Sequence, residues 1–61
     1  MTKETFNAWM KNVDNVVHAL ALVSVYDLPD MNFRDAYDDN ATPWQMGKEA
    51  LRYAGFDNDN D

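Results

Sequence analysis

The chain lacks cysteine and has a single histidine, two glycines and two prolines among its 61 residues. Without cysteine, neither a disulfide nor a thiolate zinc site can hold the fold together, and one histidine cannot build a conventional structural metal site. A single domain of this length has a marginal core, because it buries only about 60% of the surface that the unfolded chain exposes. We therefore expect stability to come from helix packing, self-association or a partner.

Basic residues are also scarce: 5 Lys and Arg stand against 11 Asp and Glu, which gives a net charge of −6. Nucleic-acid binding requires Lys and Arg to neutralise phosphates, and anionic membrane surfaces attract the same residues. We therefore expect no direct contact with nucleic acid and none with a membrane. An acidic surface suits a basic partner protein, of which a DNA-binding protein is one example, or it keeps a small protein in solution.

Long apolar runs are missing too. The longest, Ala19–Val23, is far shorter than the ~20 residues that a membrane-spanning helix needs. Polar residues at Asn7, Asn12 and Asp14 interrupt any signal-peptide core. We expect a cytoplasmic protein.

The first third of the chain has apolar residues at spacings of three and four. This period predicts an amphipathic helix from Thr2 to Ala21, with Thr2 as its N-cap and Glu4 in its first turn. Asp14 and His18 lie one turn apart on the polar face, as an ordinary surface pair. The apolar face consists of Phe6, Trp9, Met10, Val13, Val16, Val17 and Leu20.

The segment Ser24–Pro29 predicts a turn between the first and second helices. Ser24 followed by Asp27 has the form of a capping box, which indicates a single helical turn, and Pro29 ends it.

A short second helix should follow, capped by Asp30 or Asn32 and running to about Asp39. Asn40 is suited to the left-handed position that often follows a helix. The apolar stripe of this helix consists of Phe33, Ala36 and Tyr37.

A third helix, Pro43 to Ala54, is predicted to start at Thr42-Pro43-Trp44-Gln45. Thr42 can cap the helix and Gln45 can complete the capping box. Proline suits the first helical position, where its missing N–H would have no partner in the helix. Gly47 in mid-helix indicates the close approach of another helix. Gly55 suits a Schellman motif that packs Phe56 on Leu51. The apolar face consists of Trp44, Gly47, Ala50, Leu51 and Ala54.

These elements predict an all-α fold: one domain of residues 1–56, with a long first helix packed on a short second helix and a third. The core pairs the stripe of the first helix with Phe33, Tyr37, Trp44, Leu51 and Phe56. Residues 57–61 form a disordered acidic tail. Asp57, Asp59 and Asp61 match the first half of a calcium loop, but its Gly and Glu are missing, so we predict no metal or cofactor.

Aspartates are concentrated between Asp27 and Asp39, where five of them accompany one basic residue, Arg34. A docking face, for instance a mimic of nucleic-acid phosphates that occupies a DNA-binding protein, is one interpretation. Helix capping is the other, for the first three aspartates. Capping does not explain the last two, because a helix C-terminus disfavours negative charge. Arg34 pairs with Asp30 or Asp38. The predicted partner-binding set is Asp27, Asp30, Asp35, Tyr37, Asp38 and Asp39.

No catalytic residue is predicted. Histidine is a common general base, but no Ser, Cys or carboxylate is arranged to work with His18 as a catalytic pair. Three short helices cannot cover all of the apolar side chains, so an interface, most simply a homodimer built on the first helix, is expected. The surplus includes Met10, Leu22, Met31, Met46 and Tyr53.

Four groups of residues before residue 57 carry a resemblance: Phe6, Trp9 and Val13; Ser24, Asp27, Leu28, Pro29 and Asp30; Arg34, Asp35, Ala36, Tyr37, Asp38 and Asp39; and Thr42, Pro43, Ala50 and Leu51. On these residues the chain resembles a family of small uncharacterised proteins found mainly in bacteriophages, cyanophages among them, and in bacteria. Where the family pattern has Gly, this chain has Val23 and Asn40. Because Val23 cannot take a left-handed conformation cheaply, the first inter-helix turn should differ.

The resemblance implies a phage or bacterial origin and a compact helical fold, and it brings no activity with it. For a phage-encoded chain, the expected location is the host cytoplasm. Our hypothesis is a non-enzymatic, acidic protein-binding module that docks on a host or phage protein and modulates it, as a nucleic-acid mimic or another inhibitor. The alternative is a structural protein that assembles only with itself.

Overall fold

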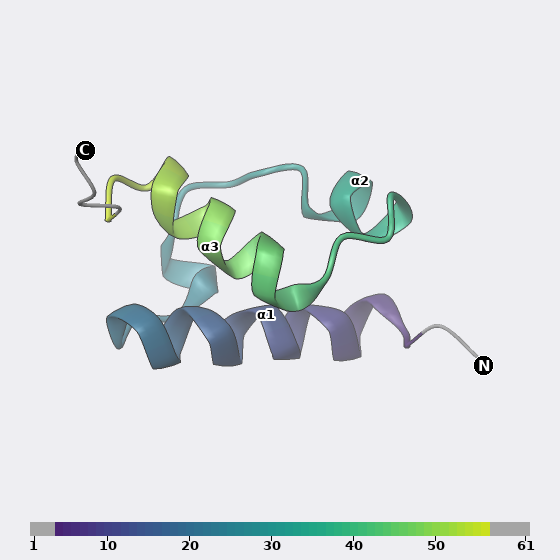
Figure 1. The fold of residues 1–61 in the computed structure, drawn as a ribbon, viewed down its shortest axis with the longest axis horizontal. Coiled ribbons are helices and arrows are strands. Elements are labelled where there is room, and N and C mark those ends of the chain that lie inside the picture. The colour runs from purple at the N-terminus through teal and green to yellow at the C-terminus, as the bar shows by residue number, and fades with distance from the viewer. Residues whose placement is uncertain (1–3, 57–61) are drawn as a thin grey trace.

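The computed structural model describes residues 4–56, which form helices and no β-strand. In chain order these are α1 (Phe6–Ala21), the 3-10 turn η1 (Val25–Asp27), α2 (Phe33–Asp38) and α3 (Pro43–Tyr53). The long α1 lies along one side of the molecule, and both α3 and α2 pack on it (Figure 1). This arrangement confirms the predicted all-α fold with a long first helix. The predicted tail, residues 57–61, lies outside the described residues.

The start of α1 differs from the prediction of a cap at Thr2. Thr5 is the N-cap, and its side chain accepts a hydrogen bond of 3.1 Å from the backbone N–H of Ala8. Glu4 precedes the helix, and its carbonyl accepts a hydrogen bond from the Tyr37 hydroxyl. The predicted first-turn position of Glu4 is therefore wrong, because the helix is capped by Thr5.

At its other end α1 stops at Ala21, as predicted. Leu22 takes the left-handed conformation, with φ 60°, and its N–H donates to the carbonyl of His18 at 2.8 Å. Val23, which the sequence marks as unsuited to that conformation, does not adopt it. Leu22, directly before it and not branched at Cβ, takes the left-handed position instead.

Asp14 secures the turn that follows. One oxygen of its carboxylate accepts from the Ser24 hydroxyl at 2.9 Å and from the backbone N–H of Val25 at 2.8 Å. The Ser24 hydroxyl in turn accepts from the N–H of Tyr26, which confirms the predicted turn start. Asp14 thus holds η1 against α1, instead of forming the surface pair predicted with His18.

The caps of α3 follow the prediction closely. Thr42 and Gln45 form a complete capping box, and Pro43 occupies the first turn. At the C-terminal end Gly55 has φ 88°, and the N–H of Phe56 donates to the carbonyl of Leu51 at 2.8 Å, the long bond of a Schellman motif. The helix itself ends at Tyr53, one residue before the predicted end.

Gly47 is the point of closest approach between α3 and α1. A Cβ atom placed on it would lie 2.5 Å from Cγ1 of Val16 and 2.9 Å from its Cβ, so only glycine fits here without movement. From this crossing α3 rises away from α1 (Figure 1). Val25 of η1, almost fully buried, joins the core that both helices share.

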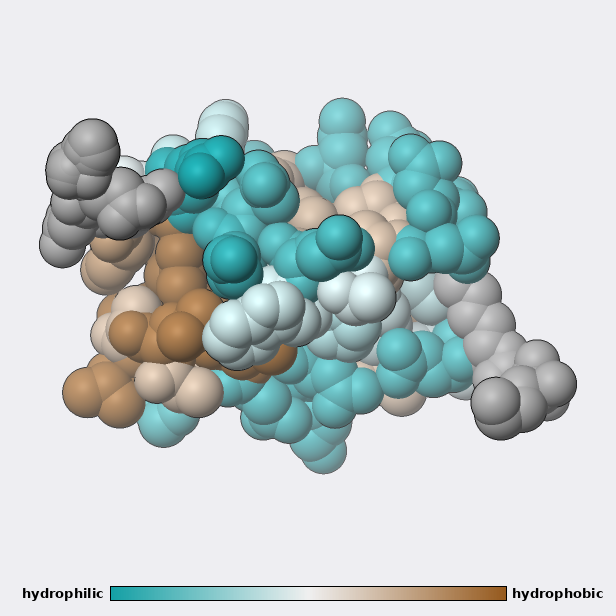
Figure 2. Space-filling model, viewed as in Figure 1, coloured by the Kyte–Doolittle hydropathy of each residue, from teal (hydrophilic) through white to brown (hydrophobic). Residues whose placement is uncertain are grey.

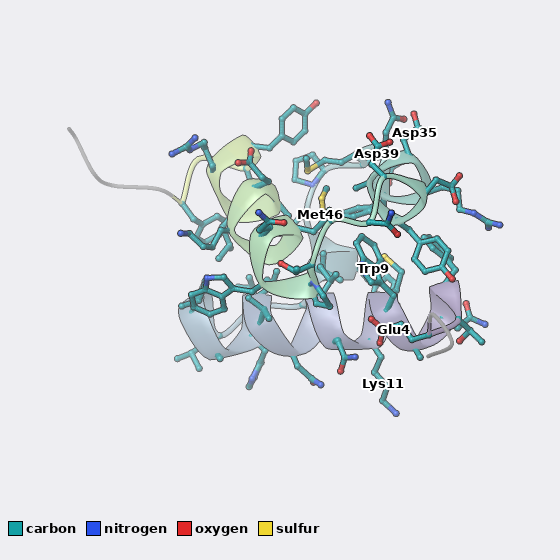
Figure 3. The ribbon with its side chains drawn as sticks, turned by 45° about the vertical axis from the view of Figure 1, so that its right-hand side comes forward. Glu4, Trp9, Lys11, Asp35, Asp39 and Met46 are labelled. Carbon is teal, nitrogen blue, oxygen red and sulfur yellow. The ribbon has the colours of Figure 1, made fainter. Side chains whose placement is uncertain are left out.

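The core differs from the predicted one mainly in α3. Trp44 is 52% exposed, whereas Met46 is only 6% exposed. The buried stripe of α3 centres on Gly47 and Ala50, and Trp44 lies roughly 90° from that centre at about 100° per residue. Figure 3 shows Met46 and Trp9 both pointing into the space between the helices. The buried apolar side chains are Trp9, Met10, Val13, Val17, Val25, Met46, Ala50 and Leu51.

Phe56 is also largely exposed, so its predicted place in the core is wrong, and Leu20 is exposed on the last full turn of α1. Both lie towards helix ends, where α1 and α3 have diverged (Figure 1).

An aromatic cluster joins α2 to the N-terminal half of α1. Tyr37 packs edge-on against Phe6 and Trp9, with ring centres 5.4 and 5.6 Å away. The indole N–H of Trp9 donates to the carbonyl of Ala41 at 2.9 Å, which satisfies the polar atom of a buried ring. These contacts fix the position of α2, which carries Asp35 and Asp38 and is followed directly by Asp39.

Candidate functional site

The five candidate aspartates, which we call the acidic surface, are all exposed on the segment that runs from η1 to the end of α2. Two of them, Asp35 and Asp39, point outward from α2 on the side away from α1 (Figure 3). Hydrophilic side chains dominate the α2 end of the view in Figure 2. The members of the acidic surface are Asp27, Asp30, Asp35, Asp38 and Asp39.

Helix stabilisation explains two of these residues. Asp27 lies in the only turn of η1, and Asp35 lies in the first turn of α2, where the helix dipole favours negative charge.

Asp30 has no such role. The N-cap position of α2 belongs to Asn32, and its side chain makes no capping hydrogen bond. The backbone of Asn32, with φ −80° and ψ 65°, is not in the extended conformation from which a side chain normally caps. Of the two predicted caps, Asn32 therefore occupies the N-cap position without a side-chain hydrogen bond, and the alternative cap, Asp30, is wrong.

Asp38 and Asp39 lie at the C-terminal end of α2, as predicted, where the dipole disfavours them. Arg34 approaches Asp38 with its Nε 4.0 Å from Oδ1, which confirms one of the two predicted pairings. The guanidinium also lies over the Phe6 ring, 5.0 Å from the ring centre. Because the pair is exposed, its contribution to stability is about 0–1 kcal/mol.

The other four carboxylates of the acidic surface make no ion pair and no side-chain hydrogen bond within residues 4–56. Internal contacts therefore leave Asp30 and Asp39 without a structural explanation. Tyr37, the sixth predicted binding residue, is half-buried in the aromatic cluster and bonded to the backbone of Glu4, so it supports α2 rather than presenting itself to a partner.

A groove of about 390 Å³ lies beside the acidic surface, between the N-terminal half of α1 and the segment that joins η1 to α2. Its apolar lining comes from Phe6, Met10, Val25, Leu28, Met31 and Phe33, and its polar lining from Tyr26, Asp30, Asn32, Arg34 and Asp35. We call it the α1–α2 groove. Of the predicted binding residues it gathers only Asp30 and Asp35; Asp27, Tyr37, Asp38 and Asp39 do not line it.

Sequence reasoning missed this groove because its two walls are far apart in the chain, from 15 positions between Met10 and Val25 to 29 positions between Phe6 and Asp35. The one available signal was the apolar surplus at Tyr26, Leu28 and Met31, which no helical stripe accounts for. Tyr26, an aromatic side chain that lines the groove, is 67% exposed.

Other kinds of site have less support. Among residues 4–56, no three His, Cys, Asp or Glu side chains are grouped so that they could hold a metal ion. None of the helices in this part of the chain combines the length and apolar character that a membrane crossing requires.

Comparison with protein-family models, with curated protein sequences and with solved structures finds no match for this chain. The resemblance to small phage and bacterial proteins therefore stays a prediction. What the chain does must be argued from its own surface.

Proposed function

We propose that this chain is a non-enzymatic protein-binding module whose acidic surface docks on a basic surface of a partner protein and thereby modulates that partner. The observation that carries the proposal is the set of exposed carboxylates from η1 to α2, most of which meet no cation within the described residues. Such a surface attracts a basic partner and raises the rate of encounter with it.

DNA-binding proteins are one source of suitable partners, because they present Lys and Arg that neutralise phosphates. An acidic module bound to those residues would compete with nucleic acid. A phage-encoded module of this kind would act on a protein in the host cytoplasm. Both the competition and the origin belong to the proposal.

Three fluorescein-labelled decapeptides test the proposal by fluorescence anisotropy. The Leu–Lys probe contains leucine and lysine in a glycine–serine background, the Ala–Lys probe has alanine in place of leucine, and the Leu–Glu probe has glutamate in place of lysine. We expect the Leu–Lys probe to bind and the Leu–Glu probe to show no binding. Affinity for the Leu–Lys probe should fall as the ionic strength rises from about 0.1 M to about 1 M, since the screening length drops from ~10 to ~3 Å.

The double variant Asp38→Asn/Asp39→Asn should weaken lysine-probe binding about twofold and leave the thermal midpoint unchanged or higher. Its matched control is Glu4→Gln/Glu49→Gln, which removes two exposed charges outside the acidic surface. Equal binding of the Leu–Lys and Leu–Glu probes, or no binding of either lysine probe, would overturn the proposal.

Self-association is a second candidate function, favoured by the apolar end of α1. Leu22, directly after the helix, is 78% exposed, and Leu20, two residues earlier, is 49% exposed. Apolar side chains gather over this end of the molecule in Figure 2, away from α2. Sedimentation equilibrium tests this candidate. If the unaltered protein is a dimer and the variant Leu20→Ser/Leu22→Asn is a monomer, self-association is supported. If the unaltered protein is a monomer at high micromolar concentration, self-association is excluded.

A further inference from the structure

The α1–α2 groove adds an apolar component to the acidic surface. Of its lining, Met10 and Val25 are buried, while Phe6, Met31 and Phe33 are only half-buried, so part of each of these three side chains is exposed. Its volume of about 390 Å³ lies at the small end of the range for binding pockets, about 300–1,000 Å³. It therefore suits one or two large side chains better than a bulky cofactor.

Charge at the mouth of the groove restricts the occupant. Asp30 and Asp35 line it, are exposed, and make no ion pair within residues 4–56. The one basic residue of the lining, Arg34, already faces Asp38 and the Phe6 ring. A cation is thus favoured at the mouth. A second copy of this chain, with a net charge of −6, would bring mostly negative charge to the same place.

Two further residues fit an apolar-plus-cationic ligand. Tyr26 is exposed at the edge of the groove, where its ring can lie against a lysine or arginine side chain. Met10 and Met31 provide flexible, polarizable walls, which tolerate anchors of different shapes.

We propose that the α1–α2 groove binds a partner segment in which a large apolar side chain stands next to a lysine or arginine. The apolar side chain enters between Phe6, Met10 and Met31, and the neighbouring cation lies against Asp30 and Asp35. This inference rests on the proposed function, since it identifies where and how the acidic surface holds a basic partner. It moves the main charge contribution from Asp38 and Asp39 to the two aspartates of the groove.

The three decapeptide probes separate this inference from the proposed function. With the unaltered protein, we expect the Leu–Lys probe to bind about tenfold more tightly than the Ala–Lys probe, because burying a leucine side chain accounts for at least that ratio. The double variant Asp30→Asn/Asp35→Asn should lower the affinity for the Leu–Lys probe about fivefold. The matched pair Asp38→Asn/Asp39→Asn should lower it about twofold.

A groove-filling variant, Met31→Trp, should reduce the Leu–Lys probe to the affinity of the Ala–Lys probe, with far-UV circular dichroism confirming the fold. If that variant does not fold, the two aspartate double variants and the ratio of the affinities for the Leu–Lys and Ala–Lys probes still test the inference. Equal affinities for the Leu–Lys and Ala–Lys probes, or equal effects of the two aspartate pairs, would refute binding in the groove without contradicting the proposed function. Failure of both lysine probes to bind would overturn the proposed function itself.

Discussion

Gly47→Ala tests the contact on which the packing of α3 against α1 depends. The new methyl group would lie 2.5 Å from Cγ1 of Val16 and 2.9 Å from its Cβ. A valine in a helix has one strongly preferred rotamer, so Val16 cannot turn aside and the two helices must separate. Overpacking of this kind costs about 1–3 kcal/mol. Alanine recovers about 1 kcal/mol of helix propensity, so we expect a net loss of about 1 kcal/mol.

Urea unfolding followed by far-UV circular dichroism gives the free energies of the double-mutant cycle with Val16→Ala. Removing Cγ1 of Val16 relieves the closer contact and leaves the 2.9 Å contact with Cβ, so Gly47→Ala should cost less in that background. The coupling should then be positive and no larger than about 1 kcal/mol. Gly55→Ala is the matched control: it is strained by a φ of 88° but has no neighbour within 4 Å, so Val16→Ala should leave its effect unchanged. A stabilising Gly47→Ala, or the same effect in both backgrounds, would refute the packing account.

Five further substitutions have defined outcomes in the same unfolding assay. Thr42→Ala should lower stability by about 1 kcal/mol through the lost capping box, whereas Asp30→Ala, which removes no cap, should change it by less than about 0.5 kcal/mol. Asp14→Ala should cost about 2 kcal/mol, because two hydrogen bonds to η1 are lost, and Ser24→Ala should cost less. Leu22→Gly should raise the free energy of unfolding by about 0.5–1 kcal/mol, because glycine adopts the left-handed conformation without the strain that leucine has there. A stable Asp14→Ala variant, or a destabilised Leu22→Gly variant, would contradict the structural roles assigned here.

Local signals in the sequence were enough to predict α3. Its start and end depend on Thr42, Gln45 and Gly55, whose side chains or backbones act within a few residues of the helix ends. The left-handed conformation of Asn40, with φ 66°, was predictable for the same reason. Such short-range capping needs no knowledge of the rest of the fold.

Long-range contacts decided what the sequence could not predict. At the start of α1, Tyr37 bonds to the backbone of Glu4, 33 positions away, and Glu4 lies outside the helix. Asp14 caps η1 instead of pairing with His18 because the chain reverses after Leu22. In the same way the five aspartates were visible as a cluster, but only the folded chain shows which of them lie beside apolar side chains from α1.

The most direct test of the central claim is the chemical-shift change of ¹⁵N-labelled protein on titration with the Leu–Lys decapeptide. Our account predicts the largest changes at the backbone amides around the α1–α2 groove, in Met10, Tyr26, Met31 and Asp35. The amides of Leu20 and Leu22, at the apolar end of α1, should barely move. Changes centred on Leu20 and Leu22, or changes no larger at the groove than at Glu49, would contradict it.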